Sequence, residues 1–217
     1  DQDKLQLALD AEKYACDFPT DENIKEAQFS RNSMIAARLK DMRYLEEYGR
    51  GIDIVIKKMQ ESSHKICTLA EAKSRRSVWK QENQQVVFTN GCFDILHLGH
   101  VDYLEKARQT GTKMIVGVNA DSSVRQLKGP SRPVNNEYAR ARILAALEFV
   151  DLVIIFEEET PLNLINELQP DILVKGDDYS IETIVGAKEV IAHGGKVTTI
   201  PLVPTYSTTN IIQKLKN

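Results

Sequence analysis

The sequence predicts an α/β protein with a parallel sheet, and three observations lead to this class. From residue 85 onward, five short runs of apolar and mostly β-branched side chains alternate with stretches of helical spacing, as in parallel sheets. The segments after these runs are small, polar or cationic, which is typical of a phosphate site rather than of plain connections. Residues 1–65 show helical spacing without such runs. We therefore expect a Rossmann-like sheet of about five parallel strands with helices on both faces, preceded by a helical N-terminal extension.

Size, composition and charge exclude several classes of protein. A chain of 217 residues can bury a sizeable core, and 42% hydrophobic with 27% charged residues is ordinary for a soluble globular protein. A net charge of −3 gives no broad basic surface, so we expect no nucleic-acid partner. No apolar run approaches the roughly 20 residues of a membrane helix, so we expect no membrane partner. Three scattered cysteines, Cys16, Cys67 and Cys92, indicate reduced thiols and a cytoplasmic location.

Residues 1–65 are expected to form a separate helical extension whose role the pattern does not reveal. Apolar residues recur at helical spacing around 34–45 and again around 52–59. These apolar faces must pack against each other, against the main domain or against a second subunit, and we expect a homodimer. The main domain is then expected to be residues 66–217.

The main domain is expected to alternate helix and strand throughout. Thr68 and Glu71 have the spacing of a capping box, so a first helix should run from Leu69 to about Lys80. The expected strands are 85–88, 113–118, 153–156, 172–174 and 196–200. The other expected helices are 99–109, 136–147, 160–168 with Thr160 as cap, 184–192, and a last one capped by Ser207.

The stretch 89–100 is the centre of the predicted site, because it joins the first strand to the next helix. His97 and His100 lie three residues apart where this loop becomes helical. A helix N-terminus carries unpaired N–H groups and partial positive charge, and it attracts phosphate. Gly99 lets a phosphate approach the backbone closely. Paired imidazoles there can donate hydrogen bonds to phosphate oxygens and stabilise the charge that develops as a phosphoanhydride bond breaks.

Other interpretations of this stretch stay open. A histidine in a loop can be an ordinary surface residue, and two histidines can be half of a metal site, since histidine is the commonest metal ligand. The remaining histidines, His64 and His193, are distant in sequence, and the strand, glycine and helix around the pair favour phosphate chemistry. Cys92 is interpreted as a small buried residue, because no base is placed to activate it as a nucleophile.

Polar residues also follow the other strands, where ligands of open parallel sheets bind. Lys128, with Arg125 and Arg132, lies in a predicted Gly/Pro-rich loop that could swing over a triphosphate or could be a solvated surface loop. Residues 207–209 open a helix with hydroxyl groups, which could bind phosphate or merely cap the helix.

Asp177 and Asp178 follow the fourth predicted strand, next to Lys175. Such a pair could hold Mg²⁺, or it could be a charged turn. Because a hard cation that binds a nucleotide needs few protein ligands, no metal site made of protein side chains is expected.

Together these motifs resemble the cytidylyltransferase-like nucleotidyltransferases and, among them, the adenylyltransferase domain of ADP-heptose synthases. The likeness covers about residues 66–217. The stretches that resemble the signatures of the superfamily are Asn90-Gly91-Cys92-Phe93-Asp94, His97-Leu98-Gly99-His100 and Ser207-Thr208-Thr209. The stretches that resemble the ADP-heptose enzymes are 127–133, 174–179 and 185–190.

The resemblance implies a reaction in lipopolysaccharide precursor synthesis. ATP and D-glycero-β-D-manno-heptose 1-phosphate would give ADP-heptose and pyrophosphate, with Mg²⁺ accompanying ATP. The sugar phosphate would attack the α-phosphorus of ATP in line, without a covalent enzyme intermediate. His97 and His100 would contact the ATP phosphates and the leaving pyrophosphate, and Lys128 would stabilise the pentavalent transition state.

The resemblance also implies binding roles for other residues. Tyr206 and the preceding Pro204-Thr205 depart from the family pattern, which leaves the local loop shape and sugar-side selectivity open. Arg140 would meet a phosphate or hold the fold, and other residues expected near the substrate or a phosphate are Asn119, Asp121, Arg132 and Asp178. Residues expected to contact the nucleotide are Thr89, Asn90, Gly91, Cys92, Phe93, Asp94, Gly99, Lys175, Gly176, Asp177, Ser207, Thr208 and Thr209.

Two rival functions are kept. A cytidylyltransferase acting on glycerol 3-phosphate would share the first and last motifs, but 127–133 and 185–190 favour the heptose enzyme. A regulator whose domain only senses a nucleotide would use residues 1–65 to contact DNA or a partner, and the intact histidine pair argues against it. Residues 31–59 resemble the end of a family of bacterial helicase-like transcription regulators. Since 1–65 is too short for the sugar kinase that precedes this domain in many bacteria, a stand-alone nucleotidyltransferase is expected.

Overall fold

The computed structural model describes residues 62–204 and 206–216, all of which belong to one compact unit. The described chain begins with a short 3-10 helix, η1 (Ser63–Lys65), and then alternates helices and strands. The expected helical extension, its proposed role in a homodimer, Cys16 and Thr205 lie outside the described residues. None of the helices in the described ranges has the length and apolar character that crossing a bilayer needs.

Five described strands form one parallel sheet, which confirms the predicted fold class. Their order is β3-β2-β1-β4-β5, so the chain begins in the middle of the sheet and extends it in both directions. The register of β1 on β2 runs from Val86 opposite Lys113 to Gly91 opposite Val118. The strands are β1 (Val86–Gly91), β2 (Lys113–Asn119), β3 (Leu152–Phe156), β4 (Ile172–Gly176) and β5 (Lys196–Ile200).

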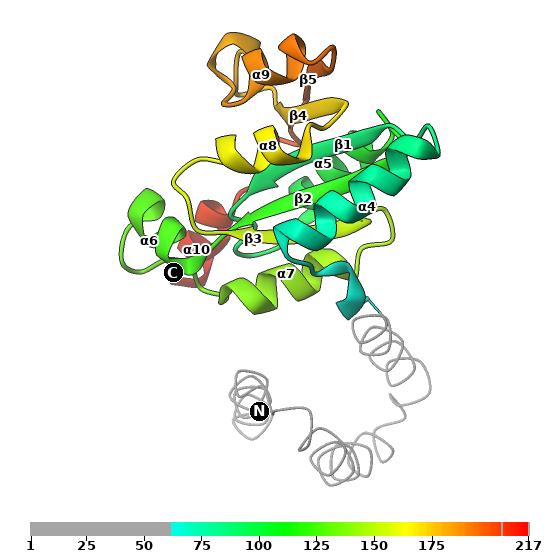
Figure 1. The fold of residues 1–217 in the computed structure, drawn as a ribbon. Helices are drawn as coiled ribbons and strands as arrows, with labels where there is room; N and C mark the ends of the chain where they lie inside the picture. Colours follow the sequence, from blue (N-terminus) through cyan, green and yellow to red (C-terminus); the bar gives the residue numbers. More distant parts are fainter. Residues whose placement is uncertain (1–61, 205, 217) are drawn as a thin grey trace, which may run out of the picture. The chain divides into compact units, whose positions relative to one another are not determined.

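Helices cover both faces of the sheet (Figure 1). One core lies between the sheet and α5 and α7, and the other lies between the sheet and α4, α8 and α9. Successive strand residues point to opposite faces, so Val87 joins the first core while Val86 and Phe88 join the second. Burial on both faces explains why the strands are continuous apolar runs. The helices are α4 (Leu69–Gln81), α5 (Leu98–Arg108), α6 (Asp121–Lys128), α7 (Glu137–Ala145), α8 (Leu162–Leu168), η2 (Ile181–Thr183), α9 (Ala187–Ala192) and α10 (Thr208–Lys216).

Side-chain caps fix the starts of three helices, two of them predicted. The capping box of α4 is present: Thr68 Oγ1 accepts from the Glu71 backbone N–H at 3.3 Å, and the Glu71 carboxylate accepts from the Thr68 N–H at 2.8 Å. Ser207 Oγ accepts from the backbone N–H of Asn210 at 3.1 Å, as a cap of α10 does. Asn136 caps α7 in the same way, at 2.8 Å.

Two central strands are longer than the sequence indicates. β1 continues through Thr89, Asn90 and Gly91, which the sequence assigns to a loop, because β2 pairs with it as far as Gly91. β4 continues through Lys175 and Gly176, which pair with β5. Several candidate residues are therefore held by the hydrogen bonds of the sheet rather than by loops.

The segment that carries Lys128 is also more ordered than expected. Residues 121–128 form α6, and Lys128 is its last residue, so the expectation of a loop is wrong for this part. Ser123 and Val124 are buried and fasten the first turn of the helix. Asn119, at the end of β2, donates from Nδ2 to Ser123 Oγ at 3.0 Å.

Two other helices begin later than expected. α8 starts at Leu162 with Pro161 as its N-cap, and ψ of 11° at Pro161 separates Thr160 from the helix, so the predicted Thr160 cap is wrong. α9 starts at Ala187 because Gly186 adopts a left-handed conformation with φ of 87°, which interrupts a helix.

Candidate active site

The strand order places a topological switch point at the carboxyl edge of the sheet, between β1 and β4. The chain passes from β1 to β2 on one side and later reaches β4 on the other, and ligands of such sheets bind at this switch point. The ends of β1 and β4 carry Asn90 and Gly91, and Lys175 and Gly176, respectively. The fold thus brings together two candidate groups that are 85 positions apart in the chain.

The histidine pair lies at the N-terminus of α5. His97 is the N-cap residue, and its carbonyl oxygen accepts hydrogen bonds from the backbone N–H groups of His100 at 2.9 Å and Val101 at 3.2 Å. The two imidazole rings stack with centroids 3.8 Å apart and 21° between their planes, and the ring of Phe93 meets that of His100 edge-on at 5.3 Å. Both Nδ1 atoms are buried, and neither has a hydrogen-bond partner. Each ring therefore has a nitrogen whose hydrogen-bonding capacity the protein leaves unused.

Burial disfavours the protonated form of both imidazoles. Together, burial and the adjacent His97 lower the pKa of His100 to about 4, against the opposing effect of a hydrogen bond with the backbone of Ile95. Burial also lowers the pKa of His97. A negatively charged ligand favours the protonated form of a histidine and raises its pKa. The pair can therefore take up a proton when an anion such as a phosphate binds.

Gly99 permits a close approach between the start of α5 and the segment before α10. A Cβ atom at Gly99 would lie 3.2 Å from the ring of His97 and 3.2 Å from Tyr206 Cβ, closer than ordinary contacts. Ser207 follows Tyr206 and caps α10. The start of α10 is therefore next to the histidines, and the residue that departs from the family pattern packs against the glycine of the signature.

The loop from β1 to α5 folds tightly through Gly91 and Phe93. A Cβ atom at Gly91 would lie 3.1 Å from the Phe93 ring. Phe93 has a positive φ of 46°, which is rare for a bulky residue and stores backbone strain. Such strain is common where a loop must present backbone groups to a ligand, and this loop is the one expected to do so.

Lys175 connects the end of β4 to the end of the adjacent strand β1. Its Nζ donates to Asn90 Oδ1 at 2.6 Å and to the Asn90 carbonyl oxygen at 3.1 Å, and it lies 5.8 Å from the centroid of the Tyr179 ring. Burial lowers the pKa of Lys175 to about 8, and the nearby Asp178 opposes this shift. The contacts of Lys175 therefore do not fully replace the hydration that its ammonium group loses on burial. A bound phosphate could supply the missing interaction.

The carboxylate of Asp94 is already engaged by the protein. Its side chain is 1% exposed; Oδ2 accepts from Arg132 Nε at 2.5 Å, and Oδ1 accepts from the backbone N–H groups of Val134 at 2.8 Å and Asn135 at 2.9 Å. Asn135 Nδ2 in turn donates to the Asp94 carbonyl oxygen at 2.7 Å. These contacts join the loop of the histidines to the segment that follows Lys128.

Arg140 is fully buried and likewise holds the fold. It donates to the carbonyl oxygens of Cys92 at 2.6 Å and Asn135 at 3.0 Å, and to Asp121 Oδ1 at 2.7 Å. The Asp121 backbone N–H donates to Glu137 Oε2 at 2.7 Å. Arg140 was expected either to meet a phosphate or to hold the fold, and these contacts are those of a residue that holds the fold.

Cations gather around the start of this loop. Burial raises the pKa of the Cys92 thiol, while Lys128, Arg140 and Arg132 lower it through their charge. Lys128 is therefore close enough to act electrostatically on the histidine loop, and its side chain is exposed. A raised pKa keeps Cys92 protonated at neutral pH, which agrees with a residue that is not a nucleophile.

Tyr103 is a residue of this region that the sequence analysis missed. Its hydroxyl lies 2.8 Å from Thr89 Oγ1 and donates to the carbonyl oxygen of Val174 at 3.0 Å, which links β1, α5 and β4. Tyr103 follows His100 by three positions on α5, and this spacing on one helix face is the signal that could have found it.

The acidic residues after β4 form no converging metal cage. Asp177 Oδ1 accepts from the Leu202 backbone N–H at 3.2 Å, and Asp178 Oδ1 would lie 2.5 Å from a Cβ atom at Gly176. Among residues 62–204 and 206–216, no three His, Cys, Asp or Glu side chains are grouped so that they could hold a metal ion.

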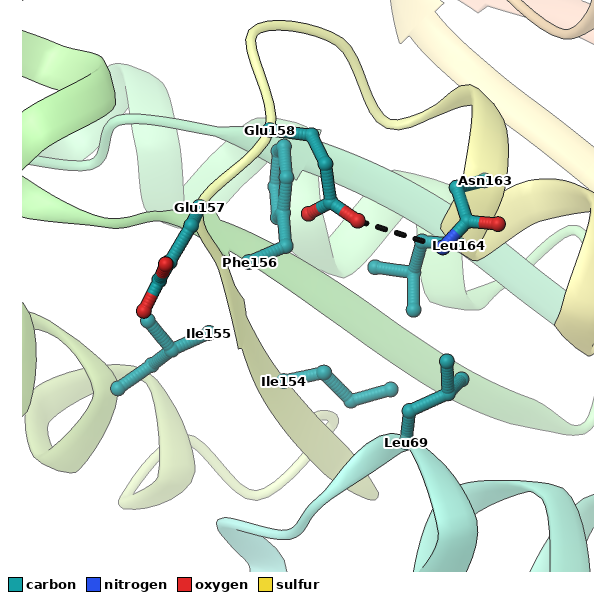
Figure 2. Close-up of a pocket in the computed structure, with 8 residues that line it drawn as sticks. All are labelled: Leu69, Ile154, Ile155, Phe156, Glu157, Glu158, Asn163 and Leu164. Carbon is teal, nitrogen blue, oxygen red and sulfur yellow. Dashed lines mark hydrogen bonds between the residues drawn. The ribbon is translucent and has the colours of Figure 1, made fainter.

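A cavity of about 430 Å³ lies elsewhere, between β3, α8 and α4. Figure 2 shows its apolar floor and the Glu157 and Glu158 side chains at its rim, where Asn163 Nδ2 donates to Glu158 Oε1 at 3.3 Å. Its lining contains none of the predicted site residues, so it is not the site described above. The lining residues are Leu69, Ile154, Ile155, Phe156, Glu157, Glu158, Asn163 and Leu164.

The chain belongs to the cytidylyltransferase-like family, whose model matches residues 88–214, more than half of its length. The match contains the histidine pair, Lys128, Lys175 and the start of α10. A second model, described as "Putative ATP-dependent DNA helicase recG C-terminal", matches residues 14–79. That span includes the 31–59 stretch and covers less than a third of the chain.

Curated relatives share about half of their residues with the matched part of the chain. The bifunctional protein HldE of Methylobacillus flagellatus is 54% identical over 151 residues, which are 70% of this chain and 31% of that protein. HldE of Magnetococcus marinus is 52% identical over 155 residues, or 71% and 32% of the two chains. The chain thus spans about a third of the length of these relatives. The solved lipopolysaccharide core biosynthesis protein of Thermoplasma volcanium is 28% identical, with 57% of this chain and 99% of that chain covered and a TM-score of 0.46.

Proposed function

We propose that this chain is a nucleotidyltransferase that transfers the adenylyl group of ATP to D-glycero-β-D-manno-heptose 1-phosphate, giving ADP-heptose and pyrophosphate. The observation that carries the proposal is the stacked pair His97 and His100, whose buried Nδ1 atoms have no hydrogen-bond partner at the start of α5. Membership of the cytidylyltransferase-like family and the identity to the HldE relatives support the reaction class and the sugar phosphate. ADP-heptose is a precursor of lipopolysaccharide.

In the proposed reaction, an oxygen of the sugar 1-phosphate attacks the α-phosphorus of ATP. A new P–O bond forms, the bond from the α-phosphorus to the bridging oxygen breaks in line, and pyrophosphate leaves. No covalent enzyme intermediate forms, so positioning and charge stabilisation supply the rate. His97 and His100 donate hydrogen bonds to the phosphate oxygens whose charge grows. Lys128, at the end of α6, stabilises the five-coordinate phosphorus.

Other residues bind ATP in this proposal. The hydroxyls and N–H groups of residues 207–209 bind the β- and γ-phosphates at the start of α10. The backbone of 89–94 and the Gly99 region approach the α-phosphate and sugar, and residues 175–177 border the nucleotide. Mg²⁺ bound to the ATP phosphates would neutralise part of their charge, and the donor set after β4 fits a cation that needs few protein ligands.

For the side chain of Asp94 we propose a part other than contact with the nucleotide, and for Arg140 the second of its two expected roles, holding the fold. Because their polar atoms are hydrogen-bonded within the protein, we propose that they shape the site without contacting ATP through these atoms. Asn119 and Asp121 belong to the same class, since Asn119 binds Ser123 and Asp121 binds Arg140.

Cytidylyl transfer to glycerol 3-phosphate is the second candidate, because the family model that matches the chain is described as cytidylyltransferase-like. The histidines, Lys128 and the start of α10 would serve it equally well. The two candidates differ in the base and in the acceptor, so they can be separated by substrate.

The test measures pyrophosphate release by the full chain with Mg²⁺, offering ATP or CTP together with heptose 1-phosphate or glycerol 3-phosphate. We expect turnover with ATP and heptose 1-phosphate, and its loss in the variant His97→Ala/His100→Ala. His193→Ala is the matched control, because His193 is exposed and distant from α5 in the chain. Turnover with CTP and glycerol 3-phosphate alone would replace the first candidate by the second.

We further propose a cytoplasmic location and a homodimer for this enzyme. Cys67 and Cys92 are free thiols, which supports a reducing compartment. The homodimer is proposed from the sequence of residues 1–65 and stays a prediction, which the mass of the full chain in solution would test.

A further inference from the structure

Two buried side chains fasten the segment around Lys128 to the loop that leads to the histidines. On the C-terminal side of Lys128, the Asp94 carboxylate accepts one hydrogen bond from Arg132 and two from the backbone of Val134 and Asn135. Hydrogen bonds to an ionised carboxylate are among the strongest in proteins. The chain is therefore fixed within four positions of Lys128.

On the N-terminal side of Lys128, Arg140 fixes the start of α6. Its guanidinium donates to Asp121 Oδ1 at 2.7 Å and also to the carbonyl oxygen of Cys92 at 2.6 Å. The same side chain thus contacts α6 and the histidine loop. Because Arg140 also donates to the carbonyl oxygen of Asn135 at 3.0 Å, both anchored ends share one buried hydrogen-bond network.

The stretch between the two anchors is exposed to solvent. We call residues 125–131 the lysine arm; all are exposed except Gly129, which is half-buried. The arm consists of the last turn of α6 and the turn after it, where the Gly129 N–H donates to the Arg125 carbonyl oxygen at 2.9 Å. Gly129 has φ of 94°, which a glycine adopts without strain, so the chain turns directly after Lys128.

We propose that Asp94 is a positioning residue that acts through Lys128: it anchors the lysine arm to the histidine loop and so sets where the ammonium group meets the reacting phosphate. The proposal rests on the proposed nucleotidyl transfer. Because both ends of the lysine arm are anchored and Lys128 belongs to α6, the reach of its exposed side chain is limited. Displacement of a catalytic group by about 1 Å can cost about 100-fold in rate.

A double-mutant cycle tests the dependence on Lys128. Asp94→Asn is chosen because its amide is similar in shape but presents no second carboxylate oxygen to Arg132. We expect kcat to fall about 100-fold in Asp94→Asn, with little change in KM for ATP. In the Lys128→Ala background the same substitution should cost less than about twofold, the scatter that independent sites show. A cost of about 100-fold in both backgrounds, or no cost in either, would overturn the proposal.

Asp151→Asn is the matched control. Asp151 also accepts hydrogen bonds from an arginine Nε, that of Arg108 at 3.3 Å, and from a backbone N–H, that of Met114 at 2.8 Å, but it lies at the amino end of the sheet. Its substitution should leave kcat within about twofold in both backgrounds. If Asp94→Asn fails to fold, Arg132→Gln removes the partner from the other side of the same ion pair, and the same cycle applies.

Hydrogen exchange separates failure of this proposal from failure of the proposed function. In the full chain without substrate, the amide protons of Val134 and Asn135 donate to Asp94, so they should exchange slowly. Asp94→Asn should speed their exchange and that of the lysine arm, whereas Asp151→Asn should not. If the wild type transfers no nucleotide, faster exchange in Asp94→Asn alone still supports the anchor, and unchanged exchange overturns it.

Discussion

The two ends of the sheet treat buried polar groups in opposite ways. At the amino ends of the strands, the carboxylates of Asp151 and Asp171 accept hydrogen bonds from basic side chains and from backbone N–H groups of neighbouring strands. At the carboxyl ends, the Nδ1 atoms of His97 and His100 are buried without partners, and Lys175 holds its charge against a lowered pKa. The carboxylates of the amino end are thus paired within the protein, whereas the carboxyl end keeps unpartnered imidazole nitrogens beside the paired side chains of Asp94 and Arg140.

This difference separates groups that stabilise the protein from groups that a ligand completes. An unpaired buried polar atom lowers the free energy of unfolding. Such an atom therefore needs an explanation, and binding or catalysis is one. Arg76 at the amino end also has unpartnered nitrogens, Nε and Nη1, but its Nη2 donates to Asp171 and its charge is therefore paired. No acidic side chain pairs with His97 or His100 among the ion pairs of the described residues.

The largest effect is expected from removal of one imidazole. His100→Ala should lower kcat for pyrophosphate release by about 100- to 1,000-fold, or about 2.7–4 kcal/mol, as loss of other preorganised donors does. The measurement is steady-state turnover beside His193→Ala, which should behave as wild type. Near-normal turnover of His100→Ala would mean that the pair is structural.

Acid should destabilise the protein through His100. The pKa of His100 is about 4 in the folded state and about 6.5 when unfolded, so the unfolded state binds a proton first as the pH falls. Stability is unaffected by this group above pH 6.5 and decreases by up to about 3 kcal/mol as the pH falls to 4. Urea unfolding at several pH values measures it, and His100→Gln should lose this part of the pH dependence. An unchanged pH dependence would contradict the account.

Substitution at the amino end of the sheet should have the opposite effect to substitution of a histidine: a loss of stability without a loss of activity. Asp151→Asn leaves donors from Arg108, Lys113 and the Met114 backbone incompletely paired. We expect a loss of about 1–3 kcal/mol in the free energy of unfolding, measured with urea. Because Asp151 is at the other end of the sheet, kcat should change by less than about twofold. A large fall in kcat would remove the distinction between the two ends.

The smallest effect concerns Lys175 at alkaline pH. Its pKa of about 8 means that the ammonium becomes neutral above this pH, so kcat/KM should fall about tenfold by pH 9. Lys175→Arg should abolish this alkaline limb, since a guanidinium stays charged. The pH profile of kcat/KM measures both. If the fall in kcat/KM at alkaline pH persists in Lys175→Arg, it is caused by the titration of another group and the prediction is wrong.

The sequence alone predicts the fold class and the position of the histidine pair at a helix start, because both depend on local sequence patterns. Apolar runs predict the strands, and the spacing of His97 and His100 at a helix start predicts their role. The contact between Lys175 and Asn90 could not be predicted, because it depends on β1 and β4 being neighbours across 85 positions. Periodicity was also insufficient to find α6, a short helix fastened by only two buried residues, Ser123 and Val124.

The role of Asp94 shows a second limit of prediction from sequence. A signature motif marks Asp94 as belonging to the site, yet it does not show whether the carboxylate faces the ligand or the protein. Only the contacts with Arg132, Val134 and Asn135 separate the two possibilities. Motifs predict which residues belong to a site. The packing of segments that are distant in sequence determines whether each side chain faces the ligand or the protein.

The most direct test follows the histidine rings themselves while a non-hydrolysable ATP analogue and Mg²⁺ are added. Nitrogen-15 NMR of the imidazoles reports their protonation and hydrogen bonding. The account predicts that the ring signals of His97 and His100 shift on binding and that the pKa of His100 rises from about 4, while the signals of His193 stay unchanged. Saturation with the analogue that leaves both rings at their free positions and pKa values would contradict the account.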